Sequence, residues 1–421
     1  MNKGWLVTFS GMGLNLALGV LYSWSVFGKQ LSDAVEKGGF GWTKTQAALP
    51  YTIAIAFFAA MMVPAGRLQD RFGPRIVSTI GAILTGLGLI VAGFVTAGSM
   101  APVIIGFGIL AGTGIGLGYA SATPAAVKWF PPAKKGLISG IVVSGFGVAS
   151  VYIAPLSKSL LAQYGVSKSF MILGIAFAIA TVIICQFIRN PVAPVVSTKQ
   201  AQAAAANKKT DYVWREMMKT KTFYLLWIEF ACGALAGLMI IGHLAKIVSV
   251  QSNNVIQTGF LFVALLAIFN AGGRLIAGVL SDYIGRMKTI LLVFISQTVI
   301  MLLFSRFSTV SAFILGSAVV GFSYGACLSV FPSTCADHWG TKNLGLNYGI
   351  LFTAWGVGGV FGPILAGKVA DASGNYSTAY IISAALLIFA AILTFFTKAP
   401  APAIIAVPAH AAPAMKEVPA D

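Results

Sequence analysis

The chain has 421 residues, of which 57% are hydrophobic and only 9% are charged. This composition excludes a soluble protein of several domains and is typical of a helical protein that crosses the lipid bilayer many times. The formal net charge of +17 raises the question of nucleic-acid binding, but the basic residues are spread over loops and form no basic domain. We therefore predict a bilayer environment and no nucleic-acid partner.

Twelve apolar segments follow one another, each about long enough to cross a hydrocarbon core of roughly 30 Å as a helix. They lie near residues 5–28, 46–66, 76–97, 101–127, 136–163, 168–189, 222–250, 255–281, 289–306, 309–333, 343–370 and 376–397. If both termini are cytoplasmic, most Lys and Arg residues fall on cytoplasmic loops, as the positive-inside rule expects. The prediction is an all-α, multi-pass protein of the cytoplasmic (inner) membrane with both termini in the cytoplasm.

The sequence repeats at a constant spacing. The loop that follows the second apolar segment contains three residues that recur 212 positions later, after the eighth segment. Gly66, Asp70 and Gly73 match Gly278, Asp282 and Gly285. A second pair of motifs, beginning at Gly136 and Gly345, is separated by 209 residues. Each offset spans an even number of segments, so the two copies have the same orientation. We predict two pseudo-symmetric six-helix halves, 1–189 and 222–398, with a cytoplasmic linker at 190–221 and a disordered cytoplasmic tail at 399–421.

Several motifs carry a family resemblance. The Gly-x-x-x-Asp-x-x-Gly loops after the second and eighth segments, set in two parallel halves, resemble the major facilitator superfamily over nearly the whole chain. A further set resembles the monocarboxylate transporters and their bacterial relatives, the oxalate/formate exchangers: Tyr22-Ser-Trp24, Lys128-Trp-Phe-Pro131, Lys135-Gly-Leu-Ile-Ser-Gly140, Phe331-Pro-Ser-Thr334, Asn347-Tyr-Gly349 and Arg274. The resemblance implies alternating access and transport of a small carboxylate.

Arg274 is a permanent cation inside the eighth apolar segment. Placing an arginine at membrane depth costs from about 3 to well above 10 kcal/mol, so this residue normally faces a polar interior. The residue 212 positions earlier is Met62, which favours a role in ligand binding over a role in folding both repeats. The alternative is an arginine held by carbonyl groups or by a carboxylate across the bundle. We predict that the carboxylate of the substrate pairs with the guanidinium through two parallel hydrogen bonds.

Three positions depart from the resemblance, and one of them is Val26, which stands where the animal monocarboxylate transporters would have a lysine. Asn270 stands where the animal monocarboxylate transporters would have a proton-carrying aspartate, and Trp355 stands where the exchangers would have a lysine. A single cation suits a monoanion, so we expect lactate, pyruvate or formate in preference to oxalate. The residues predicted to bind substrate are Arg274, Asn270, Tyr119, Tyr324, Tyr22 and Trp355. For Tyr22 the alternative is an interfacial aromatic residue, and for Trp355 it is ordinary helix packing.

Proton coupling has two candidate carriers, Glu229 and His243, both in the seventh apolar segment. An intramembrane carboxyl group and an imidazole can each gain and lose a proton near neutral pH. For Glu229 the alternative is a residue near a helix end whose side chain reaches the membrane surface. For His243 it is a hydrogen-bonded residue within the helix. The predicted activity is proton-coupled symport, with a proton as the coupling ion and no other cofactor, and carboxylate exchange is the alternative.

Four charged residues of the repeated loops, Asp70, Arg71, Asp282 and Arg286, are predicted to pair with charged groups or helix N-termini and to control the conformational exchange. The three histidines and four cysteines show no metal-ligand spacing, and no nucleophile arrangement or phosphate-binding loop is present. We therefore do not expect an enzyme. The sequence indicates neither an oligomer nor an accessory protein.

Overall fold

The computed structural model describes residues 3–37, 39–191, 211–256 and 258–400, and these residues are almost entirely helical. The first half contains α1 (Lys3–Leu18), η1 (Gly19–Ser23), α2 (Trp24–Ser32), η2 (Val35–Lys37), α3 (Lys44–Phe72), α4 (Pro74–Ala92), α5 (Ala101–Val103), η3 (Ile104–Ala111), α6 (Gly112–Val127), η4 (Pro132–Lys134) and α7 (Lys135–Cys185). The second half contains α10 (Lys221–Gln251), α11 (Gly259–Ile284), α12 (Arg286–Phe304), α13 (Val310–Trp339), α14 (Leu344–Ser373) and α15 (Ser377–Thr394).

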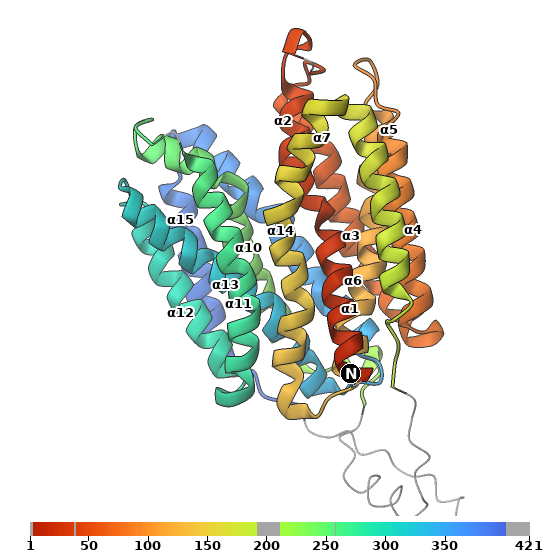
Figure 1. The fold of residues 1–421 in the computed structure, drawn as a ribbon. Helices are drawn as coiled ribbons and strands as arrows, with labels where there is room; N and C mark the ends of the chain where they lie inside the picture. Colours follow the sequence, from red (N-terminus) through yellow and green to blue (C-terminus); the bar gives the residue numbers. More distant parts are fainter. Residues whose placement is uncertain (1–2, 38, 192–210, 257, 401–421) are drawn as a thin grey trace, which may run out of the picture.

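Eleven helices in the described part of the chain are long and apolar enough to span a membrane, one fewer than the predicted number of segments. The difference lies in α7, whose 51 residues cover two predicted segments. Gly165 interrupts its helical backbone with a φ of 70°, a conformation that glycine adopts without a steric penalty because it lacks Cβ. The chain turns back there (Figure 1), so α7 provides two of the twelve crossings within the described residues.

The first crossing is not one continuous α-helix. Between α1 and α2, the five residues of η1 form a tighter 3-10 turn. A Cβ atom on Gly19 would overlap the Cβ of Ala149 in α7, so glycine allows the two backbones to approach closely here. This break in the predicted segment 5–28 contains Tyr22.

The two half-bundles meet along α3 with α14 and along α7 with α11, and the contacts follow the sequence repeat. A Cβ atom on Gly140 would lie 2.5 Å from the carbonyl oxygen of Arg274. At the equivalent place, a Cβ on Gly349 would overlap the carbonyl oxygen of Met62. The offsets of 209 and 212 residues therefore relate the two sides of one pseudo-symmetric interface, at which glycine lets helix backbones touch.

We call the end of the molecule where residues 191 and 211 lie the linker end, and the opposite end the far end. The N-terminal end of α1 and the C-terminal ends of α3 and α11 also lie at the linker end. The ribbons of the two half-bundles converge there and diverge toward the far end (Figure 1). The glycine contacts between the halves thus hold the linker end together.

Part of the predicted linker is described, namely residues 211–221 with the short helix α9 (Trp214–Met217). The backbone N–H of Tyr212 donates to the carbonyl oxygen of Trp339 at 3.0 Å, and its own carbonyl accepts from Nδ2 of Asn347 at 3.0 Å. This end of the linker is therefore fixed to the second half. Residues 192–210 of the linker and 401–421 of the predicted tail lie outside the described residues.

Candidate functional site

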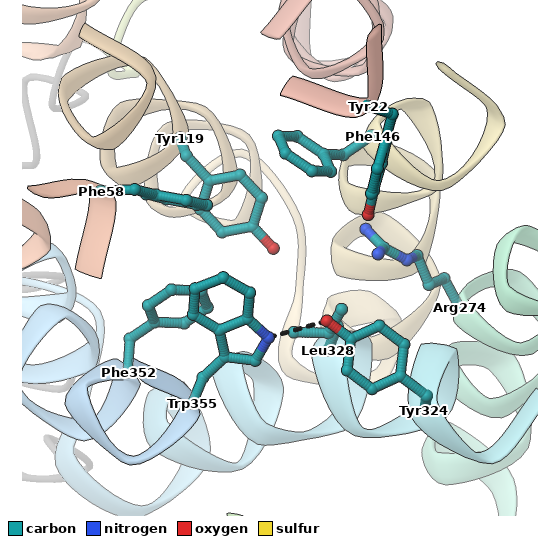
Figure 2. Close-up of a pocket in the computed structure, with 9 residues that line it drawn as sticks. All are labelled: Tyr22, Phe58, Tyr119, Phe146, Arg274, Tyr324, Leu328, Phe352 and Trp355. Carbon is teal, nitrogen blue, oxygen red and sulfur yellow. Dashed lines mark hydrogen bonds between the residues drawn. The ribbon is translucent and has the colours of Figure 1, made fainter. Parts of the chain in front are cut away.

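A small cavity lies between the two halves (Figure 2). Its volume is about 10 Å³, close to the minimum that holds one water molecule. Helices of both halves contribute its lining, which consists of Tyr22, Phe58, Tyr119, Phe146, Arg274, Tyr324, Leu328, Phe352 and Trp355. A ligand larger than water enters only when these side chains move apart.

Arg274 supplies the charge of this cavity. Its side chain is fully buried; Nε donates to Oδ1 of Asn270 at 3.0 Å, and Nη1 donates to the backbone carbonyl of Val143 at 2.6 Å. Within the described part of the chain, Nη2 has no hydrogen-bond partner and no carboxylate forms an ion pair with the guanidinium. A buried cation in this state is costly, so its free N–H groups suit an anionic ligand.

One glycine makes room for the Arg274 side chain, and another lets its helix pack closely on a neighbour. A Cβ atom on Gly147 of α7 would lie 3.2 Å from Nε of Arg274. A Cβ on Gly273 would overlap the carbonyl oxygen of Phe322, so α11 packs tightly on α13. These contacts hold the guanidinium at the boundary between the two halves.

Asn270 lies beside Arg274 and is not one of the residues that line the cavity. It precedes Arg274 by one helical turn, which places both side chains on the same face of α11. Because its Oδ1 accepts from Nε, Asn270 fixes the orientation of the guanidinium. Its direct contact with substrate stays a prediction, whereas its contact with Arg274 is an observed one.

The three tyrosines and the tryptophan that were predicted to bind substrate all line the cavity. Figure 2 shows the hydroxyl groups of Tyr119 and Tyr324 pointing toward its centre and that of Tyr22 pointing toward the guanidinium. The indole Nε1 of Trp355 donates to the hydroxyl oxygen of Tyr324 at 2.8 Å. The cavity is therefore rich in hydrogen-bond donors, and no carboxylate is among the described residues that line it.

The apolar wall of the cavity was not predicted from the sequence. The ring of Phe352 stacks on Trp355 at 4.9 Å, and the ring of Phe58 lies 5.3 Å from Trp355. Phe146 packs edge-on against Tyr119 at 5.7 Å. Phenylalanines are common in apolar helices, but Phe352 lies three residues before Trp355. That spacing, which places both on one helix face, was the available signal.

Glu229 and His243 lie in α10, and neither lines the cavity. Glu229 is fully buried, with Oε1 hydrogen-bonded to the hydroxyl of Thr397 and Oε2 unpartnered among the described residues. It is therefore not an end residue that reaches the interface. Nε2 of His243 lies 3.1 Å from the carbonyl oxygen of Pro363. The roles of both as proton carriers stay predictions.

The two aspartates of the repeated loops join the half-bundles at the linker end. The Asp282 carboxylate accepts from the backbone N–H groups of Gly136 and Leu137, at 2.9 and 2.8 Å. At the equivalent place, Asp70 accepts from the N–H of Leu346 at 2.9 Å. Both carboxylates thus sit at helix N-termini, α7 and α14, where the helix dipole favours negative charge.

The two predicted arginines of these loops differ from each other. Arg286 lies 2.7 Å from Asp282 and 2.8 Å from Asp337, which in turn pairs with Lys135 of the first half at 3.0 Å. The guanidinium of Arg71 instead lies over the ring of Phe72, 5.1 Å from its centroid, and it forms no ion pair with the described residues. The contacts therefore offer no support for Arg71 as a gating residue.

Comparison with known proteins identifies the family. A model of the Major Facilitator Superfamily matches residues 4–304 and 251–417. The chain belongs to the major facilitator superfamily. As a member it is a multi-pass membrane transporter, not an enzyme.

Relatives within the superfamily include the oxalate:formate antiporter of Oxalobacter formigenes, 30% identical over 91% of this chain and 88% of that protein. An uncharacterized transporter, YhjX, of Escherichia coli strain K12 is also 30% identical, over 85% of this chain and 86% of that protein. Monocarboxylate transporter 13 of Bos taurus is 24% identical over 91% of this chain and 87% of that protein.

Solved structures of two superfamily members share the fold. FucP in the outward conformation has a TM-score of 0.68 at 15% identity, with 92% of this chain and 98% of that chain covered. The proton:xylose symporter XylE has a TM-score of 0.72 at 14% identity, with 94% and 96% covered. At these identities the likeness shows the fold alone.

Proposed function

We propose that this protein carries short monocarboxylates such as lactate and pyruvate across the cytoplasmic membrane, with the substrate carboxylate paired to Arg274. The observation that carries the proposal is a buried guanidinium that faces the cavity with Nη2 unpartnered within the described residues. Asn270 and Val143 occupy two of its five N–H groups. An end-on carboxylate would use one N–H of Nη1 and one of Nη2 in parallel. The relatives named for oxalate, formate and monocarboxylates support this class of substrate.

A monoanion fits the charge of the cavity better than a dianion. Arg274 is the single charged residue among those that line it. The second carboxylate of oxalate would lie against the indole of Trp355 and the phenols, without a compensating cation. Burying such a charge is costly, so we expect discrimination against oxalate.

Movement of the substrate would proceed by alternating access. If both termini are cytoplasmic, the linker end, where the ribbons of the two half-bundles converge, is the cytoplasmic end. Separation of α7 from α11 would break three hydrogen bonds. The N–H groups of Gly136 and Leu137 donate two of them to Asp282, and Arg274 donates the third to the carbonyl of Val143. With the bond to Val143 broken, the guanidinium would keep Asn270 and the substrate carboxylate as its partners.

Proton-coupled symport is the coupling that we propose, because a proton that accompanies a monocarboxylate makes the transport electroneutral. Glu229 and His243 are the candidate carriers of that proton. Carboxylate exchange is a second candidate, and one observation favours it: no carboxyl or imidazole group is among the residues that line the cavity. In an exchanger, neutralisation of Arg274 by the substrate would itself permit reorientation.

Uptake of labelled L-lactate into proteoliposomes separates these alternatives. Accumulation in empty vesicles under an inward proton gradient would support symport. Uptake that requires internal lactate or oxalate, and ignores the gradient, would support exchange. Failure to move lactate, pyruvate and formate under either condition would refute the proposed transport of short monocarboxylates.

A further inference from the structure

Trp355 and Tyr324 form a hydrogen-bonded pair inside the cavity (Figure 2). Both side chains are buried, and they come from neighbouring helices of the second half, α14 and α13. The indole N–H donates to the phenol oxygen at 2.8 Å. A tryptophan N–H is a donor only, whereas a tyrosine hydroxyl has one proton and also accepts. The pair therefore leaves the proton of Tyr324 to be donated elsewhere.

The surroundings fix both partners of this pair. The ring of Phe352 stacks on Trp355 with an interplanar angle of 25°. A Cβ atom on Gly237 of α10 would lie 2.6 Å from Cδ2 of Tyr324, so the α10 backbone lies directly against the phenol ring. Among the described residues, the bond from Trp355 is the one hydrogen bond of the Tyr324 hydroxyl. The hydroxyl proton thus faces the cavity without an acceptor.

We propose that Trp355 is a positioning residue that commits the Tyr324 hydroxyl to donate to an acceptor oxygen on C2 of the substrate. This inference rests on the proposed function, since it takes the substrate carboxylate to lie on Arg274. The cavity then holds an acid at two points, a charged donor for the carboxylate and a neutral donor for the C2 oxygen. A 2-oxo acid such as pyruvate satisfies both donors, whereas propionate leaves the Tyr324 proton buried and unpaired, which is costly.

The preference for pyruvate over propionate tests this role. Uptake of labelled pyruvate into proteoliposomes would be inhibited with unlabelled pyruvate or unlabelled propionate. The preference is the inhibition constant of propionate divided by that of pyruvate. We expect Trp355→Phe to reduce this ratio about three- to tenfold, the effect of losing one oriented hydrogen bond. The KM for pyruvate should rise, whereas the KM for propionate and the maximal rates of uptake of both acids should change less.

A double variant distinguishes positioning from packing. Tyr324→Phe should lower the ratio as much as Trp355→Phe, and the double variant should lower it no further, because the two residues act through one hydroxyl. Trp227→Phe is the matched control. Nε1 of Trp227, in α10, donates to Oγ1 of Thr353 at 2.9 Å, and Thr353 lies on α14 as Trp355 does, but neither residue lines the cavity. This variant should keep the wild-type ratio.

Three outcomes would overturn the inference. If Trp355→Phe weakens the binding of both acids equally, Trp355 is a packing residue. If the effects of Trp355→Phe and Tyr324→Phe on the preference add in the double variant, Trp355 does not act through Tyr324. In both cases the transport of monocarboxylates stands. Absence of uptake of either acid by the wild-type protein would instead overturn the proposed function, and this inference with it.

Discussion

At the scale of single residues, the pairing of a carboxylate with Arg274 depends on the fork of the guanidinium. Arg274→Lys keeps the charge but cannot bond Asn270, Val143 and a carboxylate in the same geometry. We expect the KM for lactate to rise by about tenfold or more, as measured from the concentration dependence of uptake. Arg306→Lys, at an exposed loop position, is the control. A near-normal KM for Arg274→Lys would contradict the model of two parallel hydrogen bonds.

Glu229 can be tested with little change of shape. Glu229→Gln retains an acceptor for Thr397 but cannot gain or lose a proton. If Glu229 carries the coupling proton, the variant should lose lactate accumulation driven by a proton gradient, while exchange of internal for external lactate continues. Gradient-driven accumulation at the wild-type level would remove Glu229 from the mechanism, and His243→Gln would be examined in the same assay.

At the scale of helices, the contact of α7 with α11 requires glycine. Gly140→Ala would introduce a Cβ atom 2.5 Å from the carbonyl oxygen of Arg274, and overpacking of this kind costs about 1–3 kcal/mol. We expect the rate of lactate uptake, normalised to protein in the membrane, to fall about tenfold. Gly272→Ala is the control, since it lies on α11 near Arg274 but its added Cβ meets nothing within 4 Å. Equal rates for the two variants would show that this contact does not limit transport.

The helices themselves were largely predictable, and the exceptions have physical causes. Apolar segments long enough to cross a bilayer are visible in the sequence because lipid requires them. The turn at Gly165 and the 3-10 turn of Gly19–Ser23 depend on backbone angles and on contacts with other helices. Hydropathy reports neither of these. The repeat at 212 residues predicted two parallel halves, but not that Gly66 and Gly278 would lie against Gly345 and Gly136 across the interface.

At the scale of the whole molecule, the site was predictable where a residue conflicts with its environment. Arg274 was identified because a cation is expensive in a membrane. Phe58 and Leu328 fit an apolar helix equally well in the cavity or facing lipid, so the sequence did not distinguish the two. The bonds from Arg274 to Val143 and from Trp355 to Tyr324 join residues far apart in the chain and required the fold.

Alternating access predicts opposite movements at the two ends of the molecule. Spin labels at Val35 and Val255, both exposed at the far end, would report the distance between the halves there, and labels at Phe72 and Tyr283 would report it at the linker end. The four native cysteines are free and buried, so cysteines introduced at these positions would be labelled selectively. We expect saturating lactate to populate shorter far-end distances and longer linker-end distances, measured by double electron–electron resonance.

A pair within the first half, Val35 with Tyr164, should keep its distance, because each half moves as a unit. Parallel shifts at both ends would rule out rocking of the two halves about Arg274.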